Sequence, residues 1–484
     1  MKSMEFTLRY FMDRQLPASR SAEQSFREAS RGMHMKWAVL DDDPTGTQTV
    51  DHVSVFTDWS EKSIEEGFLE ARNIFFILTN SRSMTEEKTA KVHRTIAERI
   101  LRVSEKYGMD FQIICRGDST LRGHYPLETE TIKNTIEALS DIRYDGEIIC
   151  PFFPQGGRYT IDNTHYVMLE DQLCPAGETE FARDKTFGYA SSDLGAWVEE
   201  KTKGRYPASE QLYIGIEELR SENTDEIANK IASARSFQKI IVNALTYEDI
   251  YVFGTALLKC IKKGKHFLYR TAATFPEVMG GIRQHSLLKR EQVVEKDNPN
   301  GGLIIVGSHV KKTTEQLEKL LELETVVPIP FRSSLVLDPV AFQKEIEETK
   351  KKLHCLLSAG KNVVIFTERK VLLPDTENPE DALQLSMKIS DAVTSLVETL
   401  SVRPSFLIAK GGITSSEIGV KGLHVRKAEV IGQISQGVPV WRTGRESKFP
   451  GMPYIIFPGN VGAADDLKRI VEQLTVPEKV LVYC

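Results

Sequence analysis

Short apolar segments recur along the chain, and each is followed by a polar turn and then by a longer amphipathic stretch. Strands that alternate with helices in this way build parallel sheets whose two faces are covered by helices. The pattern therefore predicts an α/β fold. The predicted strands are 37–40, 74–78, 111–114, 147–150, 239–242 and 267–269 in the first half, and 303–306, 363–366, 406–409, 438–441 and 454–457 in the second.

A polar segment rich in turn-forming residues, 289–302, separates the two series of strands. Such a composition is typical of a linker between domains, and a chain of 484 residues is too long for one compact core. We therefore expect two α/β domains, 36–290 and 300–484, each a mainly parallel sheet flanked by helices, with an interdomain cleft as the binding site. Residues 1–35 are expected to form an N-terminal extension, helical or partly disordered.

Net charge, apolar run length and cysteine spacing indicate which classes of protein the chain does not resemble. A net charge of -6 and a pI near 6.0 argue against a nucleic-acid-binding protein, which needs a basic face. No apolar run is long enough to span a bilayer, and the N-terminal segment lacks the apolar core of a signal peptide. The six cysteines are scattered without a Cys-x-x-Cys pair. We expect a cytoplasmic protein with reduced thiols.

The densest cluster of reactive side chains lies in residues 115–128, directly after a predicted strand. It contains Asp118, Ser119 and Arg122. Ligands of α/β proteins gather at the carboxyl ends of strands. A guanidinium binds a carboxylate or phosphate, and an Asp beside it can hold hydroxyls or a metal. The cluster predicts a site for a small, polyhydroxylated, anionic ligand, and a loop held together by its own ion pairs is the alternative.

Three other polar turns follow predicted strands of the first half. Residues 41–43 are three consecutive aspartates, whose mutual repulsion has to be offset by a cation or by hydrogen-bond donors such as Mg²⁺, a substrate hydroxyl or nearby arginines. A solvated acidic turn is the alternative. The turn 79–83 contains Arg82, and the turn 150–159 combines two prolines and two glycines with Arg158.

Three glycine-containing turns of the second half, 307–314, 410–417 and 458–462, each precede a predicted helix. Free backbone N–H groups at a helix N-terminus favour anions. Three such turns in one domain predict a site for a nucleotide polyphosphate. The chain has neither a Walker motif nor the Gly-x-Gly-x-x-Gly fingerprint of dinucleotide-binding domains.

Together these motifs resemble the four-carbon acid sugar kinase family over nearly the full length from about residue 36. The family's Asp-Asp-x-Thr-Gly corresponds to residues 42–46, and its Asp-Ser-Thr-x-Arg-Gly corresponds to 118–123. Its Pro-x-Phe-Pro-x-x-Gly-Arg corresponds to 151–158. Gly307-Ser308 resembles the Gly-Ser element that opens its nucleotide domain.

The resemblance implies an N-terminal domain that binds the acid sugar and a C-terminal domain that binds ATP with Mg²⁺. Three positions depart from the family pattern: the acidic residue before Thr414 is Ile413, the Lys before the last glycine turn is Phe457, and the Ser two residues after the Gly-Ser pair is Val310. Candidates to compensate are Lys410, Arg442 and Arg445. The residues expected at ATP are Ser308, Gly411, Gly412, Ile413, Thr414 and Gly459.

We therefore predict an ATP-dependent kinase that phosphorylates a hydroxyl of a tetronate, an oxo-tetronate or a related small sugar acid. Asp42 or Asp118 is expected to orient the hydroxyl and to accept its proton. A non-catalytic two-domain sensor of a small acid is an alternative, as is a metal-dependent hydrolase or aldolase using residues 41–43. Oligomeric state is left open, with a homo-oligomer as one option. The residues expected to bind the acid sugar are Asp43, Arg82, Ser119, Arg122 and Arg158.

Overall fold

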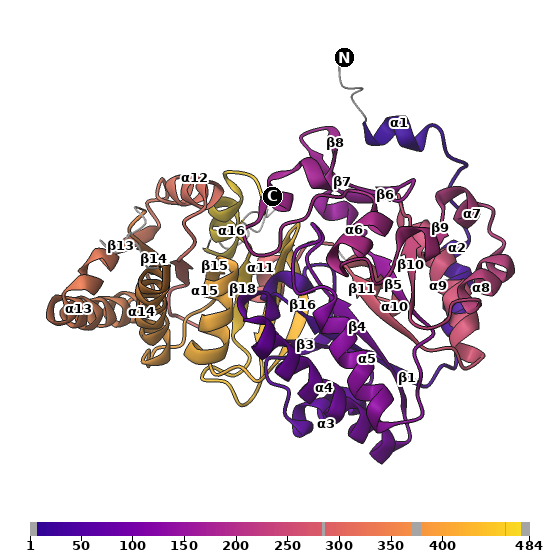
Figure 1. The fold of residues 1–484 in the computed structure, drawn as a ribbon. Coiled ribbons are helices and arrows are strands. Elements are labelled where there is room, and N and C mark those ends of the chain that lie inside the picture. The colour runs from indigo at the N-terminus through magenta and orange to yellow at the C-terminus, as the bar shows by residue number, and fades with distance from the viewer. Residues whose placement is uncertain (1–6, 283–285, 370–378, 460, 476–484) are drawn as a thin grey trace, which may run out of the picture. The chain divides into compact units, whose positions relative to one another are not determined.

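The computed structural model describes residues 7–282, 286–369, 379–459 and 461–475 (Figure 1). Contacts divide the chain into two compact units, Met1–Gly46 with Asp58–Arg283, and Thr47–Thr57 with Gln284–Cys484. The sequence alone places Thr47–Thr57 in the first domain. Its strand β2 (Val53–Phe56) instead pairs with β16 (Lys427–Ser435), so main-chain hydrogen bonds attach this segment to the second unit.

The first unit is built on a parallel sheet of seven strands in the order β3-β1-β4-β11-β5-β10-β9. The central strands are buried along nearly their whole length, as expected of a parallel sheet with helices on both faces. The predicted α/β fold is confirmed for this unit. The strands are β1 (Met35–Asp41), β3 (Ile74–Leu78), β4 (Asp110–Arg116), β5 (Gly146–Cys150), β9 (Leu212–Ile214), β10 (Gln238–Val242) and β11 (Phe267–Thr271).

Helix α4 (Glu86–Tyr107) begins at an N-capping side chain and ends at a glycine. Before α4, the side chain of Thr85 accepts a hydrogen bond from the backbone N–H of Lys88, and the helix ends at Gly108 with a φ of +60°. The α-helices are α3 (Glu61–Leu69), α4 (Glu86–Tyr107), α5 (Leu127–Leu139), α6 (Leu194–Lys201), α7 (Ile216–Arg220), α8 (Thr224–Ala232), α9 (Tyr247–Lys262) and α10 (Thr274–Met279), and the 3-10 helices are η1 (Pro44–Thr47), η2 (Ser81–Ser83), η3 (Pro154–Gly156), η4 (Ala176–Glu178), η5 (Glu180–Arg183) and η6 (Ala208–Glu210).

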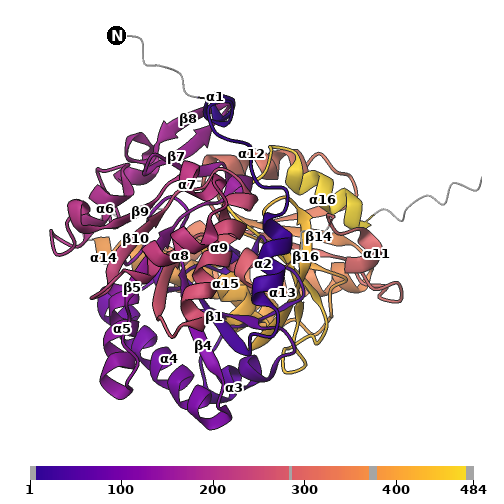
Figure 2. The same cartoon turned by 90° about the vertical axis from the view of Figure 1, so that its right-hand side faces the viewer.

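The N-terminal segment is helical, with α1 (Leu8–Met12) and α2 (Ala22–Ser30). Helix α2 lies along α9 (Figure 2). Its Phe26 is buried against Tyr251, and a Cβ on Gly254 would come within 2.9 Å of the Phe26 ring. The absence of a side chain at Gly254 thus allows this close helix packing.

A small antiparallel sheet, which the sequence did not predict, lies beside the main one. It consists of β6 (Arg158–Ile161), β7 (Thr164–Leu169) and β8 (Gln172–Pro175). Asp162 and Asn163 between β6 and β7 both have positive φ, as the tightest hairpin turns require. The hairpin begins at Arg158 and therefore sets the position of that side chain.

The second unit has a mixed sheet in the order β13-β14-β12-β15-β18-β17-β16-β2. Its first five strands are parallel, whereas β17, β16 and β2 are antiparallel. Its other strands are β12 (Leu303–Val306), β13 (Val326–Phe331), β14 (Asn362–Thr367), β15 (Leu407–Lys410), β17 (Val438–Thr443) and β18 (Pro453–Phe457). The predicted strand at 438–441 is present as β17, but its antiparallel pairing could not be read from the apolar pattern.

Helices flank the sheet of the second unit, and α12 and α16 pack against each other. Within the described part of the chain, every helix is too short or too polar to cross a bilayer. The helices of this unit are α11 (Arg290–Val293), α12 (Lys311–Leu320), α13 (Pro339–Ser358), α14 (Pro379–Glu398), α15 (Gly412–Glu417) and α16 (Asp466–Thr475), with a 3-10 helix η7 (Ser333–Leu337) and a π-helix η8 (Ile418–Gly422).

Candidate functional site

Polar side chains of the first unit converge at the carboxyl ends of three neighbouring strands. The last residue of β1, Asp41, lies opposite Leu78 of β3 and Arg116 of β4. Because the strands are parallel and end in register, the turns that follow them lie side by side. The structure therefore brings together the segments 41–43, 81–83 and 116–123.

Arginines and aspartates alternate through this site, which we call the strand-end cluster (residues 41–43, 82, 116, 118 and 122). Arg82 donates to both carboxylate oxygens of Asp42, at 2.8 and 3.3 Å. It also lies 3.4 Å from Asp43 and 3.8 Å from Asp118. Arg122 Nε donates to Asp118 Oδ2 at 2.7 Å. The two arginines thus share Asp118 as a common anionic partner.

Arg158 takes no part in these ion pairs. Its guanidinium and that of Arg122 lie near the ring of Phe181, with Cζ 5.8 and 5.1 Å from the ring centroid. Among the described residues, its buried Nε has no hydrogen-bond partner. Burial lowers the pKa of Arg158, and the negative charge of Asp118 opposes this only in part. A half-buried guanidinium with a buried, unused donor can bind a carboxylate.

Ser119 is buried in the same turn, and its carbonyl oxygen accepts a hydrogen bond from His165 Nε2 at 2.8 Å. Burial lowers the pKa of His165 to about 4, so the imidazole is neutral near pH 7. Its other nitrogen, Nδ1, lies 3.0 Å from the Thr160 hydroxyl. His165 therefore fixes the turn and is not available as an acid or base.

Arg116 and Glu128 lie in the polar segment 115–128 that the sequence indicated, although neither was assigned a role, and Arg270 was missed. Arg116 contacts Asp41 at 3.2 Å, and Arg270 contacts Glu128 at 2.9 Å. Arg270 also donates to the carbonyl oxygen of Arg122 at 2.8 Å. All three side chains are buried. A charged residue at the end of an otherwise apolar strand, as at Arg270, was the signal available in the sequence.

Glycine is required where the chain passes over Arg270. A Cβ on Gly117 would lie 2.0 Å from Arg270 Nη1, and a Cβ on Gly123 would lie 2.8 Å from Arg270 Nη2. Real side chains do not approach so closely. The glycines of the 115–128 segment therefore make room for a buried cation that holds the turn from below.

We expect Gly117→Ala to destabilise the protein by about 1–3 kcal/mol, the usual cost of overpacking a buried site. The added methyl group would displace the Arg270 guanidinium from Glu128 and from the carbonyl group of Arg122. Urea denaturation compared with Gly215→Ala measures the effect, because a Cβ on Gly215 meets nothing within 4 Å. Equal midpoints for the two variants would show that Arg270 is not packed as described.

Burial and neighbouring charges shift the pKa values of Asp41, Asp42 and the half-buried Asp118 in different directions. Burial raises the pKa of Asp41 to about 7 against the opposing effect of Arg116. Burial also raises the pKa of Asp42, and Arg82 does not fully cancel this. Burial acts on Asp118 too, but Arg82, Arg122 and a hydrogen bond from Thr120 hold its pKa well below the usual range. Asp118 is therefore held as an anion, whereas the pKa of Asp42 is shifted in the opposite direction, toward the protonated form.

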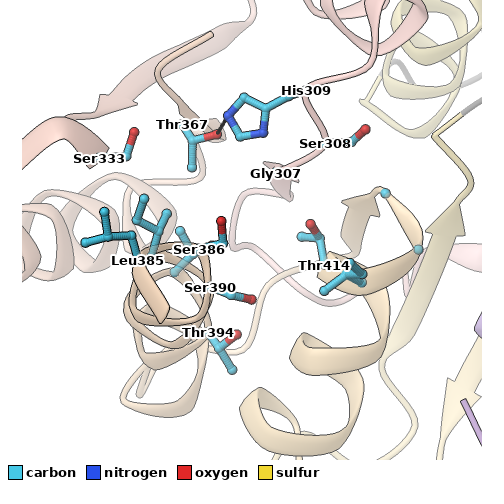
Figure 3. Close-up of a pocket in the computed structure, with 15 residues that line it drawn as sticks. Gly307, Ser308, His309, Ser333, Thr367, Leu385, Ser386, Ser390, Thr394 and Thr414 are labelled. Carbon is cyan, nitrogen blue, oxygen red and sulfur yellow. Dashed lines mark hydrogen bonds between the residues drawn. The ribbon is translucent and has the colours of Figure 1, made fainter. Parts of the chain in front are cut away.

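A separate cavity of about 390 Å³ lies in the second unit, where β12, β14 and β15 end (Figure 3). The segment Gly307–His309 forms one side, and α15 with the turn before it forms another. Helix α14 supplies a third side with small polar and apolar side chains. Its described lining consists of Gly307, Ser308, His309, Ser333, Thr367, Leu385, Ser386, Ile389, Ser390, Val393, Thr394, Gly411, Gly412, Ile413 and Thr414.

The glycine turns approach one another closely at this cavity. A Cβ on Gly307 would lie 2.3 Å from Thr414 Oγ1, and one on Gly411 would lie 2.9 Å from Ser308 Cβ. The predicted residues Ser308 and 411–414 are thus brought together. Gly459 is not among the described residues of the cavity wall, although a Cβ there would be 3.2 Å from Ser308 Oγ.

Side chains of α12 hold the last glycine turn in place. The Thr313 hydroxyl lies 3.1 Å from the carbonyl oxygen of Gly459 and donates to it. Gln316 Nε2 donates to the carbonyl oxygens of Val461 and Ala463 at 3.1 and 2.8 Å. Lys311 and Lys312 occupy the first turn of this helix, which has no acidic residue there. The arrangement favours an anion beside the turns.

Comparison with known families assigns a class to each half of the chain. The model of a sugar-binding N-terminal domain matches residues 37–279, and that of a nucleotide-binding C-terminal domain matches residues 303–467. The chain belongs to the four-carbon acid sugar kinase family. The strand-end cluster therefore lies in the sugar-binding domain, and the cavity lies in the nucleotide-binding domain.

Solved structures of similar fold extend over nearly the whole chain. A Haemophilus influenzae protein from a family of unknown function is 15% identical, with a TM-score of 0.58, and the match covers 91% of this chain and 100% of that one. A Salmonella typhimurium protein described as a tRNA synthase is also 15% identical, with a TM-score of 0.62 and the same coverage. No curated protein matches the sequence. The neighbours support the fold of this family member.

At one of the three departures from the family pattern, Phe457, a lysine lies close by in the structure. Phe457 ends β18 and pairs in register with Lys410 of β15, whose Nζ lies 3.9 Å from the centre of the Phe457 ring. Arg442 donates to the carbonyl oxygens of Gln292 and Gly451 instead, and Arg445 is exposed. Of the three candidate cations, Lys410 is the one at the glycine turns.

The second departure leaves no carboxylate on the described cavity wall. Ile413 is 67% exposed and takes the position of the family's acidic residue. Among the described residues, no group of three or more His, Cys, Asp and Glu side chains is arranged to hold a metal. The hydroxyl groups of the described cavity wall include those of Ser308 and Thr414 on the glycine turns. A Mg²⁺ ion in this cavity would therefore be held chiefly by phosphate oxygens and water.

Proposed function

We propose that this protein is an ATP-dependent kinase that phosphorylates a hydroxyl group of a four-carbon or related sugar acid. One observation carries the proposal. The sugar-binding domain has a strand-end cluster rich in arginine and aspartate, and the nucleotide-binding domain of the same chain has a cavity lined by glycine turns. We further propose that the domains extend over 36–290 and 300–484, with Thr47–Thr57 attached to the second of them.

The arginines are suited to an acid sugar. Arg158 has a buried and unused donor, and Arg122 lies on the same aromatic ring, so the two are proposed to bind the carboxylate. Asp43 is less buried than Asp42 and is proposed to bind a hydroxyl group. Arg82 then orders the three aspartates around it. Such charge-assisted contacts each contribute roughly 1.5–3 kcal/mol.

Asp42 is the proposed proton acceptor, and Asp118 is the proposed electrostatic anchor. A general base works best when its pKa lies near the operating pH, and burial moves Asp42 in that direction. Asp118 is held ionised by two arginines and keeps them aligned. Phosphoryl transfer otherwise needs alignment of the acceptor hydroxyl with the γ-phosphate and positive charge on the transferred oxygens.

ATP is the proposed phosphoryl donor. Backbone N–H groups of the turns at 307–310 and 411–414 are proposed to hold its phosphates. Leu385, Ile389 and Val393 of α14 form an apolar wall for the base, with Ser390 and Thr394 between them. Mg²⁺ would neutralise charge on the phosphates.

The direct test is ADP release measured against a panel of erythronate, threonate, oxo-tetronates and branched acids of similar size. The proposal requires that one of them stimulate ADP formation with equal amounts of phosphorylated acid. Tight binding of an acid without turnover would instead indicate a sensor. Turnover of an acid without nucleotide would indicate a hydrolase or aldolase.

We expect Arg158→Leu to raise KM for the sugar acid by about 10- to 100-fold, with a much smaller change in the KM for ATP. The substitution removes the unused guanidinium donor and leaves the apolar contact with Phe181. Arg183→Leu is the matched control, because this exposed arginine lies in the same 3-10 helix as Phe181. A KM for the acid that is unchanged in Arg158→Leu would remove Arg158 from the substrate site.

A further inference from the structure

Lys410 lies where the three glycine turns of the second unit meet. Its carbonyl oxygen accepts hydrogen bonds from the backbone N–H groups of Gly307 and Ser308, both at 3.4 Å. It directly precedes Gly411. Its ammonium group donates to the carbonyl oxygens of Pro458 and, at 3.3 Å, of Gly459. A single residue thus touches the turns at 307–310, 410–417 and 458–462.

The ammonium group of Lys410 is completely buried, with 0% exposure, and has no ionic partner among the described residues. Its contacts are two carbonyl oxygens and the face of the Phe457 ring. A buried charge without a counter-ion is costly, and proteins usually pair it or neutralise it. The charge therefore fits a site whose counter-ion arrives with a ligand.

We propose that Lys410 is a proton-linked positioning residue of the nucleotide site, whose ammonium charge is completed by the phosphates of the bound nucleotide. This inference rests on the proposed function, because it needs a phosphate beside the glycine turns. The proposed role of Lys410 makes nucleotide binding depend on pH: binding takes up a proton, and the affinity falls as the pH rises.

The charged groups around Lys410 determine the direction of the effect. Burial lowers the pKa of Lys410 to about 7, Lys312 on α12 lowers it further, and Asp466 on α16 opposes them. Asp466 itself pairs with Arg469 and accepts a hydrogen bond from the N–H of Ala463. β12 and β18 present no charged side chain, and Glu417 of α15 pairs with Lys421.

Bound phosphate raises the pKa of Lys410, so nucleotide affinity is higher when Lys410 is protonated. Below about pH 7 the group is protonated with or without nucleotide, and affinity does not change with pH. Between about pH 7 and the higher pKa of the complex, affinity falls by up to about tenfold per pH unit. His309 on the cavity wall has a pKa lowered by burial and by Arg369, so it stays neutral in this range.

The experiment is isothermal titration of the full-length protein with ADP between pH 6.5 and 9, in buffers with different enthalpies of ionisation. The wild-type protein is expected to take up between about half a proton and one proton per ADP at pH 8. Lys410→Met is expected to bind ADP about 10- to 100-fold more weakly at pH 6.5 and to take up none, so its difference from wild type shrinks as the pH rises.

Lys410→Gln separates charge from hydrogen bonding, because the amide can still donate to the carbonyl oxygens of Pro458 and Gly459. If the positive charge is required, Lys410→Gln takes up no proton on binding ADP, as is expected for Lys410→Met. Wild-type affinity and proton uptake in Lys410→Gln would overturn the inference and leave the nucleotide site intact. No binding of ADP by the wild-type protein would overturn both this inference and the proposed function.

Discussion

Asp42→Asn is expected to lower kcat for sugar-acid phosphorylation by roughly 10²–10⁴-fold, the usual contribution of a general base. Asn is nearly the same size and can still accept a hydrogen bond from Arg82, which keeps Asp43 and Asp118 as partners. The Asn side chain, however, cannot accept the proton of the sugar hydroxyl. KM for ATP should change little, because the nucleotide cavity lies in the other unit.

The measurement is initial-rate ADP release, with the wild-type rate followed over pH. Activity of the wild type should fall as the pH falls through the raised pKa of Asp42, since a base must be deprotonated to act. Asp171→Asn, at an exposed position of the same unit, is the control. Wild-type kcat in Asp42→Asn would assign the proton to another group, and Asp118→Asn would then be the next variant to measure.

Gly411→Ala is expected to weaken nucleotide binding by about 10- to 100-fold. Gly411 has a φ of +118°, a conformation that L residues rarely adopt and that costs on the order of 1–3 kcal/mol. In addition, the new Cβ would lie 2.9 Å from Ser308 Cβ. The turn must therefore shift, and the backbone N–H groups that precede α15 move with it.

Titration with ADP and with ATP measures this effect, and binding of the sugar acid should be retained. Gly215→Ala again serves as the control for adding a methyl group where there is space. If Gly411→Ala binds nucleotide as tightly as the wild type, the phosphates do not bind at this turn. A loss of sugar-acid binding in the same variant would point to general unfolding instead.

The positions of the polar turns could be predicted because each follows an apolar strand. Asp41, Arg82 and Asp118 come after three different strands, and strands alternating with helices are parallel, so their carboxyl ends share one edge of the sheet. This alternation is visible in the sequence itself. It also placed the glycine turns of the second half at one edge, where β12 and β15 are in fact neighbours.

Partners that are distant in sequence could not be predicted. Arg270 is buried only because Glu128 of α5 neutralises it and because Gly117 and Gly123 leave room for it. The antiparallel strands and the β6–β8 hairpin depend on pairings that apolar periodicity does not specify. The wall formed by α14 was missed because serines on one face of a helix resemble ordinary surface residues.

The sequence by itself determined the α/β class, the two-part organisation and the strand ends that carry arginine, aspartate and glycine, because these depend on local periodicity and turn chemistry. Only the tertiary structure decided which charges are compensated. It paired Asp118 with two arginines and left the buried Nε of Arg158 without a hydrogen-bond partner in the described part of the chain. It also placed Lys410 beside the glycine turns, with no salt-bridge partner among the residues that the structure describes. Burial and the distance to the nearest opposite charge govern these properties, and both arise only when distant segments pack together.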